Sequence, residues 1–384
     1  MKKHYFLGLA AGRKGAFRQL FTRGSERDVS QLKFYLQKRY NGEAILAKNG
    51  RSALTLALKA YFKKGDAVIV NGFTCYAVYE AIKAAGLTPV FADIAKGDLN
   101  FDIDTLKALE PFRSGHAPGR APESTVPSET IPSAIKGIIV QNTLGNPVNI
   151  AEIEKFAKEH QLTIIEDLAH CVGVEYPDGR EAGTVGAATV LSFGKDKSID
   201  TTSGGAVILR DPCKNVIKAP SKIPKISDYL RERFYPLFGV MCRGLSYVHL
   251  GGAPMRLFIK IHWVEKSADN RLDLARRPAK FETKLALEQL KKINKAKPLR
   301  EFYLVRSRDE VLDKLKEAGY YFDGFWYEKP VSPVRYYKKV HFPEESCPVA
   351  VEVSQKIVNL PTYYSKKDLA PARKIIEEYL DERA

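Results

Sequence analysis

Short apolar runs alternate with amphipathic helical runs between residues 44 and 210, and this alternation limits the possible folds more than any other feature of the chain. Strands that alternate with helices of roughly 10–15 residues indicate a parallel α/β sheet, which binds ligands at the C-terminal ends of its strands. A strand with one solvent-exposed face alternates apolar and polar residues. Three apolar runs (VIV, IIV and TII) lack this alternation, so we expect these strands to be buried on both faces. The sequence therefore predicts an α/β fold with a large parallel or mixed sheet.

The chain has 384 residues, which is too long for one small domain. We expect an N-terminal segment and α/β domain over 1–210, a basic, apolar insert or lid over 211–280, and a smaller C-terminal α+β domain over 281–384. Residues 113–134 are rich in Pro, Ser and Gly and should form a surface loop. The apolar run at 5–11 is too short for a signal peptide, and no run approaches the roughly 18–20 apolar residues of a membrane span.

Positive charge is concentrated in one part of the chain. The net charge is +16, and residues 213–300 hold 20 Lys and Arg against 7 Asp and Glu. This indicates either an anionic partner (a phosphorylated substrate, anionic lipid or nucleic acid) or a solvated helical surface. Nucleic acid is not expected, because no helix-turn-helix, zinc or RNP-like motif is present and the charge lies outside the α/β part. The five cysteines form no CxxC pair, which argues against a zinc site or disulfide framework and suits a reducing cytoplasm.

Two segments carry chemically active side chains just after predicted strands. In IIEDLAH, the carboxylates of Glu166 and Asp167 follow two apolar strand residues. In LSFGKDKS, a strand ends at Ser192, and the next loop carries Lys195 and Lys197. A lysine at a strand exit near a buried carboxylate suits Schiff-base chemistry, because desolvation lowers the pKa of an amine and lets it attack a carbonyl. Either segment alone would be explained as well by an ordinary cap or surface loop.

A third segment, KNGRSALTLAL, predicts an anion site. Its Gly-polar-Ser turn leads directly into a helix, where free backbone N–H groups and the helix dipole favour a phosphate, although an ordinary helix cap gives the same pattern. Together the three segments supply a phosphate site, a carboxylate and a lysine on one sheet. Pyridoxal 5'-phosphate (PLP) requires a Schiff-base lysine and an acidic partner for its pyridinium nitrogen. We therefore expect PLP as the cofactor and no metal.

Seven motifs of the chain follow one another in a recognisable order. NGRSALTLAL, VIVNGFTCYAVYEAI, TPVFADI, IIEDLAHCVG, SFGKDK and SGGAVIL are followed near the C-terminus by SCPVAVEVSQKIVNLPTYY. The chain thereby resembles the DegT/DnrJ/EryC1/StrS family of PLP-dependent sugar aminotransferases, well over 44–210 and loosely over 281–384. The resemblance implies the PLP-dependent transferase fold of the aspartate-aminotransferase type I, with a large mixed sheet domain and a smaller C-terminal domain.

The resemblance also implies which residues carry the chemistry. Lys197 would form the Schiff base and shuttle a proton, and its spacing from the SF motif selects it over Lys195. Asp167 would keep the pyridine nitrogen protonated, which makes the ring an electron sink. His170 would approach the ring or its 3'-oxygen. The alternative is that His170 is a core histidine whose hydrogen bonds are all made within the protein.

The resemblance implies a phosphate site with four residues: Gly50, Arg51, Ser52 and Ser192. Arg51 replaces the usual Thr, so it either strengthens phosphate binding or points outward. Many relatives have an aromatic residue stacked on the ring where this chain has Cys75, followed by Tyr76, which leaves the identity of the stacking residue open. The family's Gly-x-Asn-x-Arg motif, whose Asn reaches across a dimer, is not recognisable here.

The function implied by the resemblance is transamination. A nucleotide-linked keto-sugar would be converted to an amino-sugar with glutamate as donor, in polysaccharide or amino-sugar biosynthesis. Enzymes of this fold build each active site at a two-fold interface, so we expect a homodimer. A PLP-dependent sugar dehydratase or lyase is an alternative, but such relatives replace the lysine, often with His, so Lys197 argues against it. A non-catalytic regulatory protein is a second alternative, which the presence of Lys197 and Asp167 disfavours.

Residues 226–263 predict a basic, amphipathic segment. Apolar residues spaced three or four apart share one helical face: Leu230, Phe234, Leu237, Met241, Leu245 and Val248. Pro236 should kink or interrupt this helix. One interpretation is a lid or interdomain helix, which would bury Leu237, Met241 and Leu245. The other is contact with an anionic membrane or a lipid-linked sugar, which would leave them open and make the protein peripheral at the membrane.

Overall fold

The computed structural model describes most of the chain. It covers residues 4–5, 12–109, 133–210, 213, 215, 217, 225–248, 253–254, 257, 280–293, 298–321 and 326–381. The surface loop expected at 113–134 lies outside the described residues except for its last two, which begin a strand.

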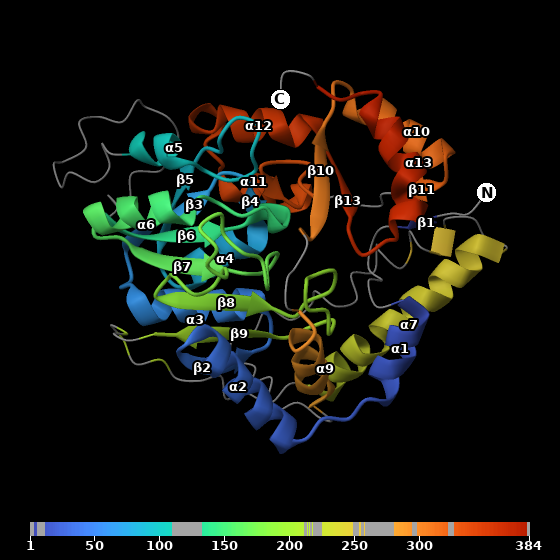
Figure 1. The fold of residues 1–384 in the computed structure, drawn as a ribbon, viewed down its shortest axis with the longest axis horizontal. Coiled ribbons are helices and arrows are strands. Elements are labelled where there is room, and N and C mark those ends of the chain that lie inside the picture. The colour runs from blue at the N-terminus through green and yellow to red at the C-terminus, as the bar shows by residue number, and fades with distance from the viewer. Residues whose placement is uncertain are drawn as a thin grey trace.

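A seven-stranded sheet forms the centre of the molecule (Figure 1). Its strands are β2 (Glu43–Ala47), β3 (Asp66–Asn71), β5 (Thr88–Ala92), β6 (Ser133–Gln141), β7 (Thr163–Asp167), β8 (Ala188–Ser192) and β9 (Gly205–Leu209). They lie in the order β2-β9-β8-β7-β6-β3-β5. The strands from β8 to β5 run parallel, as the sequence predicts. Because β9 runs antiparallel to both β8 and β2, the sheet is mixed.

Helices cover both faces of this sheet. They are α2 (Glu26–Tyr40), α3 (Gly50–Tyr61), α4 (Tyr76–Ala84), α5 (Ile103–Lys107), α6 (Ile150–Glu159) and α9 (Phe281–Leu290). α3 and α4 pack into the core on one face, and α2, α5, α6 and α9 pack into the core on the other. Along β3, Ala67 and Ile69 belong to one core, whereas Val68 and Val70 belong to the other. The prediction of strands buried on both faces is therefore confirmed.

One edge of the sheet gathers the polar ends of its strands. The last residues of β3, β6, β7 and β8 are Asn71, Gln141, Asp167 and Ser192. Because β9 runs in the opposite direction, its first end lies at this same edge, where Gly204 pairs with Asn49 just before α3. Parallel α/β sheets bind ligands at this edge.

The C-terminal portion packs a strand pair against helices. Its main elements are β10 (Arg300–Leu304), α10 (Arg308–Glu317), α12 (Pro348–Lys356), β13 (Ile357–Pro361) and α13 (Lys366–Glu377). β10 and β13 are antiparallel, and α10 and α13 share their core. Asp93, which follows β5, joins this portion to the sheet, because its carboxylate accepts hydrogen bonds from the amides of Val349 (3.0 Å) and Ala350 (2.9 Å) at the start of α12.

A second close approach between the two portions lies at Gly145. Its φ is +91°, and an added Cβ would lie only 2.6 Å from the amide nitrogen of Leu299, just before β10. Glycine is therefore required there both by its backbone conformation and by the available space.

Short elements complete the described structure. They are β1 (His4–Tyr5), β4 (Thr74–Cys75), η2 (Thr143–Gly145), β11 (Tyr320–Tyr321), β12 (Val331–Ser332), η5 (Val334–Tyr336), α11 (Tyr337–Val340) and η6 (Glu344–Ser346). β1 pairs in parallel with β11, and β4 pairs in parallel with β12. Residues from the beginning of the chain therefore lie against its C-terminal portion.

The remaining helices, α1 (Gly12–Phe21) and α7 (Ile226–Val248), pack against each other beside the sheet (Figure 1). The predicted helix is confirmed over α7, and Pro236 lies within it without ending it. Met241 is 56% exposed and Leu245 is 47% exposed, whereas Leu237 is partly buried. The lid interpretation required all three to be buried, and it is wrong for Met241 and Leu245. Within the described part of the chain, no helix is both long and apolar enough to cross a bilayer.

Candidate active site

A cavity of about 130 Å³ lies at the polar edge of the sheet. Seven of the nine predicted site residues line it: Gly50, Arg51, Cys75, Asp167, His170, Ser192 and Lys197. A void of this size accommodates a single aromatic ring. The fold thus brings predicted residues from four separate segments of the chain to one cavity.

The amine of Lys197 lies inside this site. Its Nζ is 2.8 Å from Nε2 of His170 and 4.4 Å from the centre of the Trp326 ring. Burial lowers the pKa of Lys197 below its ordinary value, and Cys75 and Asp167 oppose this effect. Lys195 points elsewhere, with its amine 5.5 Å from the ring centre of Tyr235 on α7. The geometry therefore agrees with the choice of Lys197 over Lys195.

The hydrogen bonds of His170 indicate the charge state of this amine. The amide of Leu144 donates to Nδ1 at 3.2 Å, so Nδ1 carries no proton. Burial, with Lys197 and Arg300 nearby, lowers the pKa of His170 well below its ordinary value, so the ring is neutral and its proton is on Nε2. That N–H can donate only to a lone pair on Nζ of Lys197. This hydrogen bond and the lowered pKa of Lys197 both favour the unprotonated amine, which is the form that attacks a carbonyl.

Asp167 is a buried carboxylate that faces the cavity. Its Oδ1 accepts a hydrogen bond of 3.0 Å from the amide of Ala169, and no described residue donates to Oδ2. Burial raises the pKa of Asp167, while that amide and the charge of Lys197 lower it. A cation such as a protonated pyridine nitrogen would favour the ionised form.

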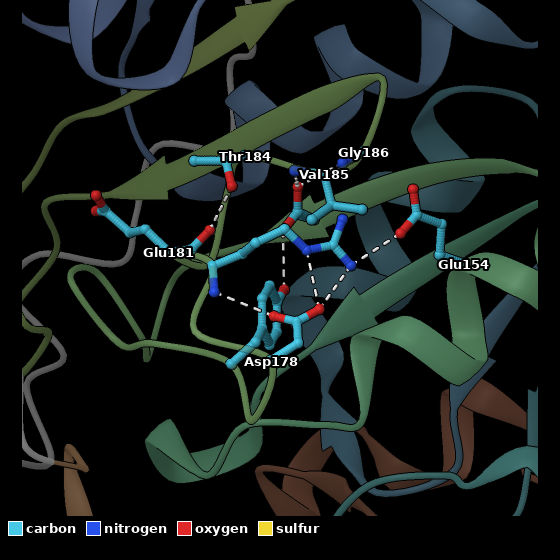
Figure 2. Close-up of polar contacts among 9 residues, drawn as sticks. Glu154, Asp178, Glu181, Thr184, Val185 and Gly186 are labelled. Atoms are coloured by element: carbon cyan, nitrogen blue, oxygen red, sulfur yellow. Dashed lines mark hydrogen bonds and ion pairs between the residues drawn. The ribbon is translucent and has the colours of Figure 1, made fainter.

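The neighbouring Glu166 belongs to a different environment, because successive strand residues point to opposite faces of a sheet. Its Oε1 accepts hydrogen bonds from the hydroxyl of Tyr176 (2.8 Å) and the amide of Gly183 (2.7 Å). Its Oε2 accepts from the amides of Val185 (2.9 Å) and Gly186 (2.6 Å), whose loop is shown in Figure 2. Glu166 is therefore a structural carboxylate that holds this loop, which leaves Asp167 as the acid of the cavity.

The start of α3 supplies the anion site. Asn49 caps the helix by accepting the amide of Ser52 at 2.8 Å, and the amides of Gly50 and Arg51 have no acceptor among the described residues. An added Cβ on Gly50 would lie 2.7 Å from Cβ of Ser192, so only glycine allows the helix to approach β8 this closely. Two free amides, a helix N-terminus and a hydroxyl fit a phosphate group. With Asp167 and Lys197 alongside, the residues present fit PLP.

Comparison with known proteins agrees with this geometry. Residues 30–217 match the model of the DegT/DnrJ/EryC1/StrS aminotransferase family. This match includes every predicted site residue. The chain is therefore similar to the DegT/DnrJ/EryC1/StrS aminotransferase family over residues 30–217, just under half of its length.

Two curated relatives illustrate the range of this family. GDP-perosamine synthase of Escherichia coli O157:H7 is 31% identical over 169 residues, which are 44% of this chain and 40% of that protein. The dTDP-4-dehydro-2,6-dideoxy-D-glucose 3-dehydratase of Saccharopolyspora spinosa is 29% identical over 222 residues, which are 55% of this chain and 42% of that protein. The chain thus matches less than half of the length of either relative.

The fold extends beyond the matched segment. A DegT/DnrJ/EryC1/StrS aminotransferase from Brucella abortus superposes with a TM-score of 0.64 at 19% identity. The superposition covers 96% of this chain and 98% of that protein. The expected PLP-dependent transferase fold, with its large mixed sheet and C-terminal portion, is confirmed.

Three predicted residues lie differently from their family roles. Ser52 does not line the cavity, and its amide is occupied by Asn49. Arg51 lines the cavity but forms an ion pair with Glu80 on α4. Tyr76 stacks on Tyr336, with ring centres 4.3 Å apart, and does not line the cavity. Of the two candidates for contact with the cofactor ring, Cys75 lines the cavity and Tyr76 does not.

Sequence reasoning missed several residues near the amine. Gln141 and Asn142 line the cavity at the end of β6, where the strand pattern could have indicated them. Trp326 stacks on His170, with ring centres 5.0 Å apart. Tyr327 stacks on Phe73 at 4.6 Å and has a left-handed φ of +71°. Nothing in the local sequence of these C-terminal aromatic residues points to a site more than a hundred residues away.

A buried acid in the Lys197 loop predicts a pH dependence of stability. Burial and the charge of Asp196 raise the pKa of Asp200 to about 7. In the unfolded chain an aspartate titrates near ~3.9, so between these values the folded state binds more protons and the free energy of unfolding falls as pH rises. Asp200→Asn should remove this contribution and flatten the slope between about pH 4 and 7.

Urea unfolding of both proteins at several pH values measures this slope. Absolute stability is not the readout, because Asn also loses one of two amide acceptor bonds, from Asp196 (3.1 Å) or Thr202 (2.9 Å). Equal slopes in the two proteins would contradict the prediction.

Proposed function

We propose that this protein is a PLP-dependent aminotransferase that transfers an amino group from glutamate to a nucleotide-linked keto-sugar. The observation that carries this proposal is the amine of Lys197, whose pKa is lowered by burial, in one cavity with the buried carboxylate of Asp167. The family of residues 30–217 supports the same activity.

Each residue of the cavity has a role in this proposal. PLP, when bound, supplies an electron sink that allows an amino group to move between carbon atoms. Lys197 attacks the carbonyl and moves the proton, and His170 holds its amine in the neutral form. Asp167 keeps the pyridine nitrogen protonated. The amides of Gly50 and Arg51 bind the phosphate.

The nature of the sugar is inferred from charge and from relatives. The excess of Lys and Arg over 213–300 suits a diphosphate-bearing substrate. The names of the two relatives include a GDP-sugar and a dTDP-sugar, and one of them is a dehydratase. The presence of Lys197 favours transamination over dehydration, and over a regulatory protein without catalysis.

A panel of nucleotide-linked keto-sugars, each supplied with glutamate, tests this function. The expected result is 2-oxoglutarate in equal amount to an aminated sugar. A deoxygenated sugar without transfer of nitrogen would support the dehydratase instead. Purified protein without a Schiff-base absorbance band would contradict both enzymes and support the regulatory alternative.

The proposal includes assembly and domain organisation. Because enzymes of this fold build each active site at a two-fold interface, we infer a homodimer. We also retain the division into 1–210, 211–280 and 281–384, with one addition: β1 lies against β11 of the C-terminal portion. We infer a cytoplasmic protein.

We further propose that α7 holds the protein at an anionic membrane surface. Large apolar side chains are exposed along one helical face: Ile226, Leu230, Phe234, Met241 and Leu245. Residues 213–300, which include α7, carry the excess of Lys and Arg; two copies of this stretch would repel each other, whereas anionic lipid attracts it by about 1 kcal/mol per Lys or Arg near the surface. We expect co-sedimentation with anionic liposomes at low salt and release at high salt.

Two variants and one control sharpen this experiment. Met241→Glu and Leu245→Glu should weaken binding several-fold, because each puts a negative charge on the apolar face. Phe34→Glu changes a more exposed apolar residue, on α2, and should have no effect. Light scattering tests the alternative, in which this face binds a second copy of the chain. If the parent is a dimer that binds no liposomes, and both variants dissociate it, the face belongs to a second copy.

A further inference from the structure

The loop that carries Lys197, residues 193–204, is bonded to helices that lie outside the central sheet. Gln289 on α9 binds the backbone of Asp200 twice: its Oε1 accepts from the Asp200 amide at 2.9 Å, and its Nε2 donates to the Asp200 carbonyl at 2.8 Å. The loop is therefore held in place shortly after Lys197.

Two further side chains, one from α1 and one from α7, bond to the end of this loop. Gln19 on α1 donates to the hydroxyl of Thr202 at 2.9 Å and to the carbonyl of Glu232 at 3.1 Å. The hydroxyl of Ser203 donates to the carboxylate of Glu232, on α7, at 2.9 Å. All four of these side chains are at most 5% exposed, so water does not compete for their hydrogen bonds.

Thr202 is the strained point of the loop. Its φ is +69°, a left-handed conformation that is unfavourable for a β-branched residue and persists only where the surroundings enforce it. Those surroundings are hydrogen bonds, because the amide of Thr202 donates to Oδ1 of Asp200 at 2.9 Å and its hydroxyl bonds to Gln19. Loss of these bonds would let the backbone relax and would change the course of the loop.

The course of this loop affects both sides of the candidate site. On one side, Nζ of Lys197 reaches Nε2 of His170 at 2.8 Å. On the other, the carbonyl of Gly204 accepts from the amide of Phe193 at 2.8 Å, and Gly204 pairs with Asn49, the cap of α3 at the anion site. A shift of the loop would therefore move the amine relative to the rest of the cavity.

We propose that Gln19 and Glu232 are positioning residues, which hold this strained loop so that the amine of Lys197 stays against His170. Both lie outside residues 30–217, so the similarity to the family gives neither of them a role. The inference deepens the proposed function and rests on it for the effect on turnover. Its effects on the loop and on the amine are measurable without turnover.

Hydrogen exchange of the 193–204 amides, followed by mass spectrometry of the purified full-length protein, is the first test. Glu232→Ala and Gln19→Ala should each speed this exchange about tenfold, as expected for loss of one ordinary buried hydrogen bond. Ser203→Ala breaks the bond to Glu232 from the side of the loop and should have the same effect. Glu232→Gln keeps an oxygen that accepts from Ser203, so it should retain most of the protection.

Asp228→Ala is the matched control for Glu232→Ala. It also removes a carboxylate from α7, but that carboxylate pairs with Arg231 on the same helix. Exchange of the 193–204 amides should therefore stay at the parent rate. Equal acceleration by the two variants would mean that α7 acts only through its own stability, and would overturn the proposal.

The reactivity of the Lys197 amine is the second test. Formaldehyde with a borane reductant methylates unprotonated amines, so peptide mapping at several pH values gives a profile for each lysine. After hydroxylamine has removed any bound PLP, Lys197 of the parent should react at lower pH than an exposed lysine, because burial lowers its pKa. Glu232→Ala should move this profile to higher pH. A lower melting temperature with an unchanged profile and unchanged loop exchange would make Glu232 merely structural and overturn the proposal.

Thr202→Gly tests whether Gln19 acts through the strained residue. Glycine adopts a left-handed φ without strain and lacks the hydroxyl that Gln19 binds. Gln19→Ala should therefore accelerate loop exchange less in the Thr202→Gly protein than in the parent. Equal effects in the two backgrounds would show that Gln19 does not act through Thr202, and would contradict its part of the proposal.

Steady-state kinetics of the PLP-loaded protein separate this inference from the proposed function. Glu232→Ala should lower kcat and leave the KM for glutamate nearly unchanged, because it displaces the amine that moves the proton. An altered KM with an unchanged kcat would overturn the proposal. If the parent protein shows no Schiff-base absorbance band, the proposed function fails, while hydrogen exchange and methylation still decide whether Glu232 positions Lys197.

Discussion

Replacement of Lys197 by alanine is expected to lower turnover more than about 10³-fold, because one change removes both the nucleophile and the base that moves the proton. The contacts at Gly50 and Asp167 remain, so the variant should still bind PLP without a covalent bond. We therefore expect bound cofactor without the Schiff-base absorbance band. Absorbance and transamination rate of the purified variant measure both effects.

Lys195→Ala is the matched control for this prediction. Lys195 is in the same loop, but its amine lies against Tyr235, so activity should stay near that of the parent. Borohydride reduction of the parent protein, followed by peptide mapping, should locate the cofactor on Lys197. An adduct on Lys195, or no adduct, would contradict the assignment.

Replacement of Asp167 by asparagine should lower turnover by orders of magnitude while the fold survives. The change keeps the shape and removes the charge that sustains a protonated pyridine nitrogen. Loss of an opposite charge beside a cation shifts its pKa by about 1–3 units, which weakens the electron sink accordingly. The rate of transamination and the cofactor spectrum as a function of pH measure this effect.

Glu166→Gln is expected to have the opposite effect, because it should lower stability and leave the cofactor unaffected. Glu166 accepts four hydrogen bonds from its loop, three of them from backbone amides. A glutamine would turn its NH₂ group toward some of these donors. Each buried group left without a partner should lower the free energy of unfolding by about 1–3 kcal/mol. We expect a lower melting temperature with an unchanged cofactor spectrum. Near-full activity of Asp167→Asn would instead mean that another acid serves the cofactor.

The sheet and the cavity residues before 210 could be predicted because their signals are local. Strand and helix periods, the glycine turn at Gly50 and the lysine five residues after Ser192 are all readable within short windows. Parallel strands then bring these windows together at one edge by topology alone. The reversed direction of β9 was not readable, because an apolar run looks the same in either direction.

The C-terminal contribution could not be predicted for a physical reason. Trp326 lies against the Lys197 amine only through long-range packing, in which Asn359 bonds both to Arg300 and to the Trp326 carbonyl. A lone Arg at a strand start and a Trp near a turn carry no periodic or spacing signal. The exposure of Met241 was equally hidden, because an amphipathic pattern does not reveal which surface, if any, covers the apolar face.

The close approach at Gly145 acts as a spacer between two halves of the candidate site. The turn that contains it also presents the Leu144 amide to His170, and the strand that begins just beyond its contact with Leu299 carries Arg300. A single missing side chain thus sets how closely this turn approaches the start of β10. A methyl group there would act as a wedge and would displace the turn that presents the Leu144 amide to His170.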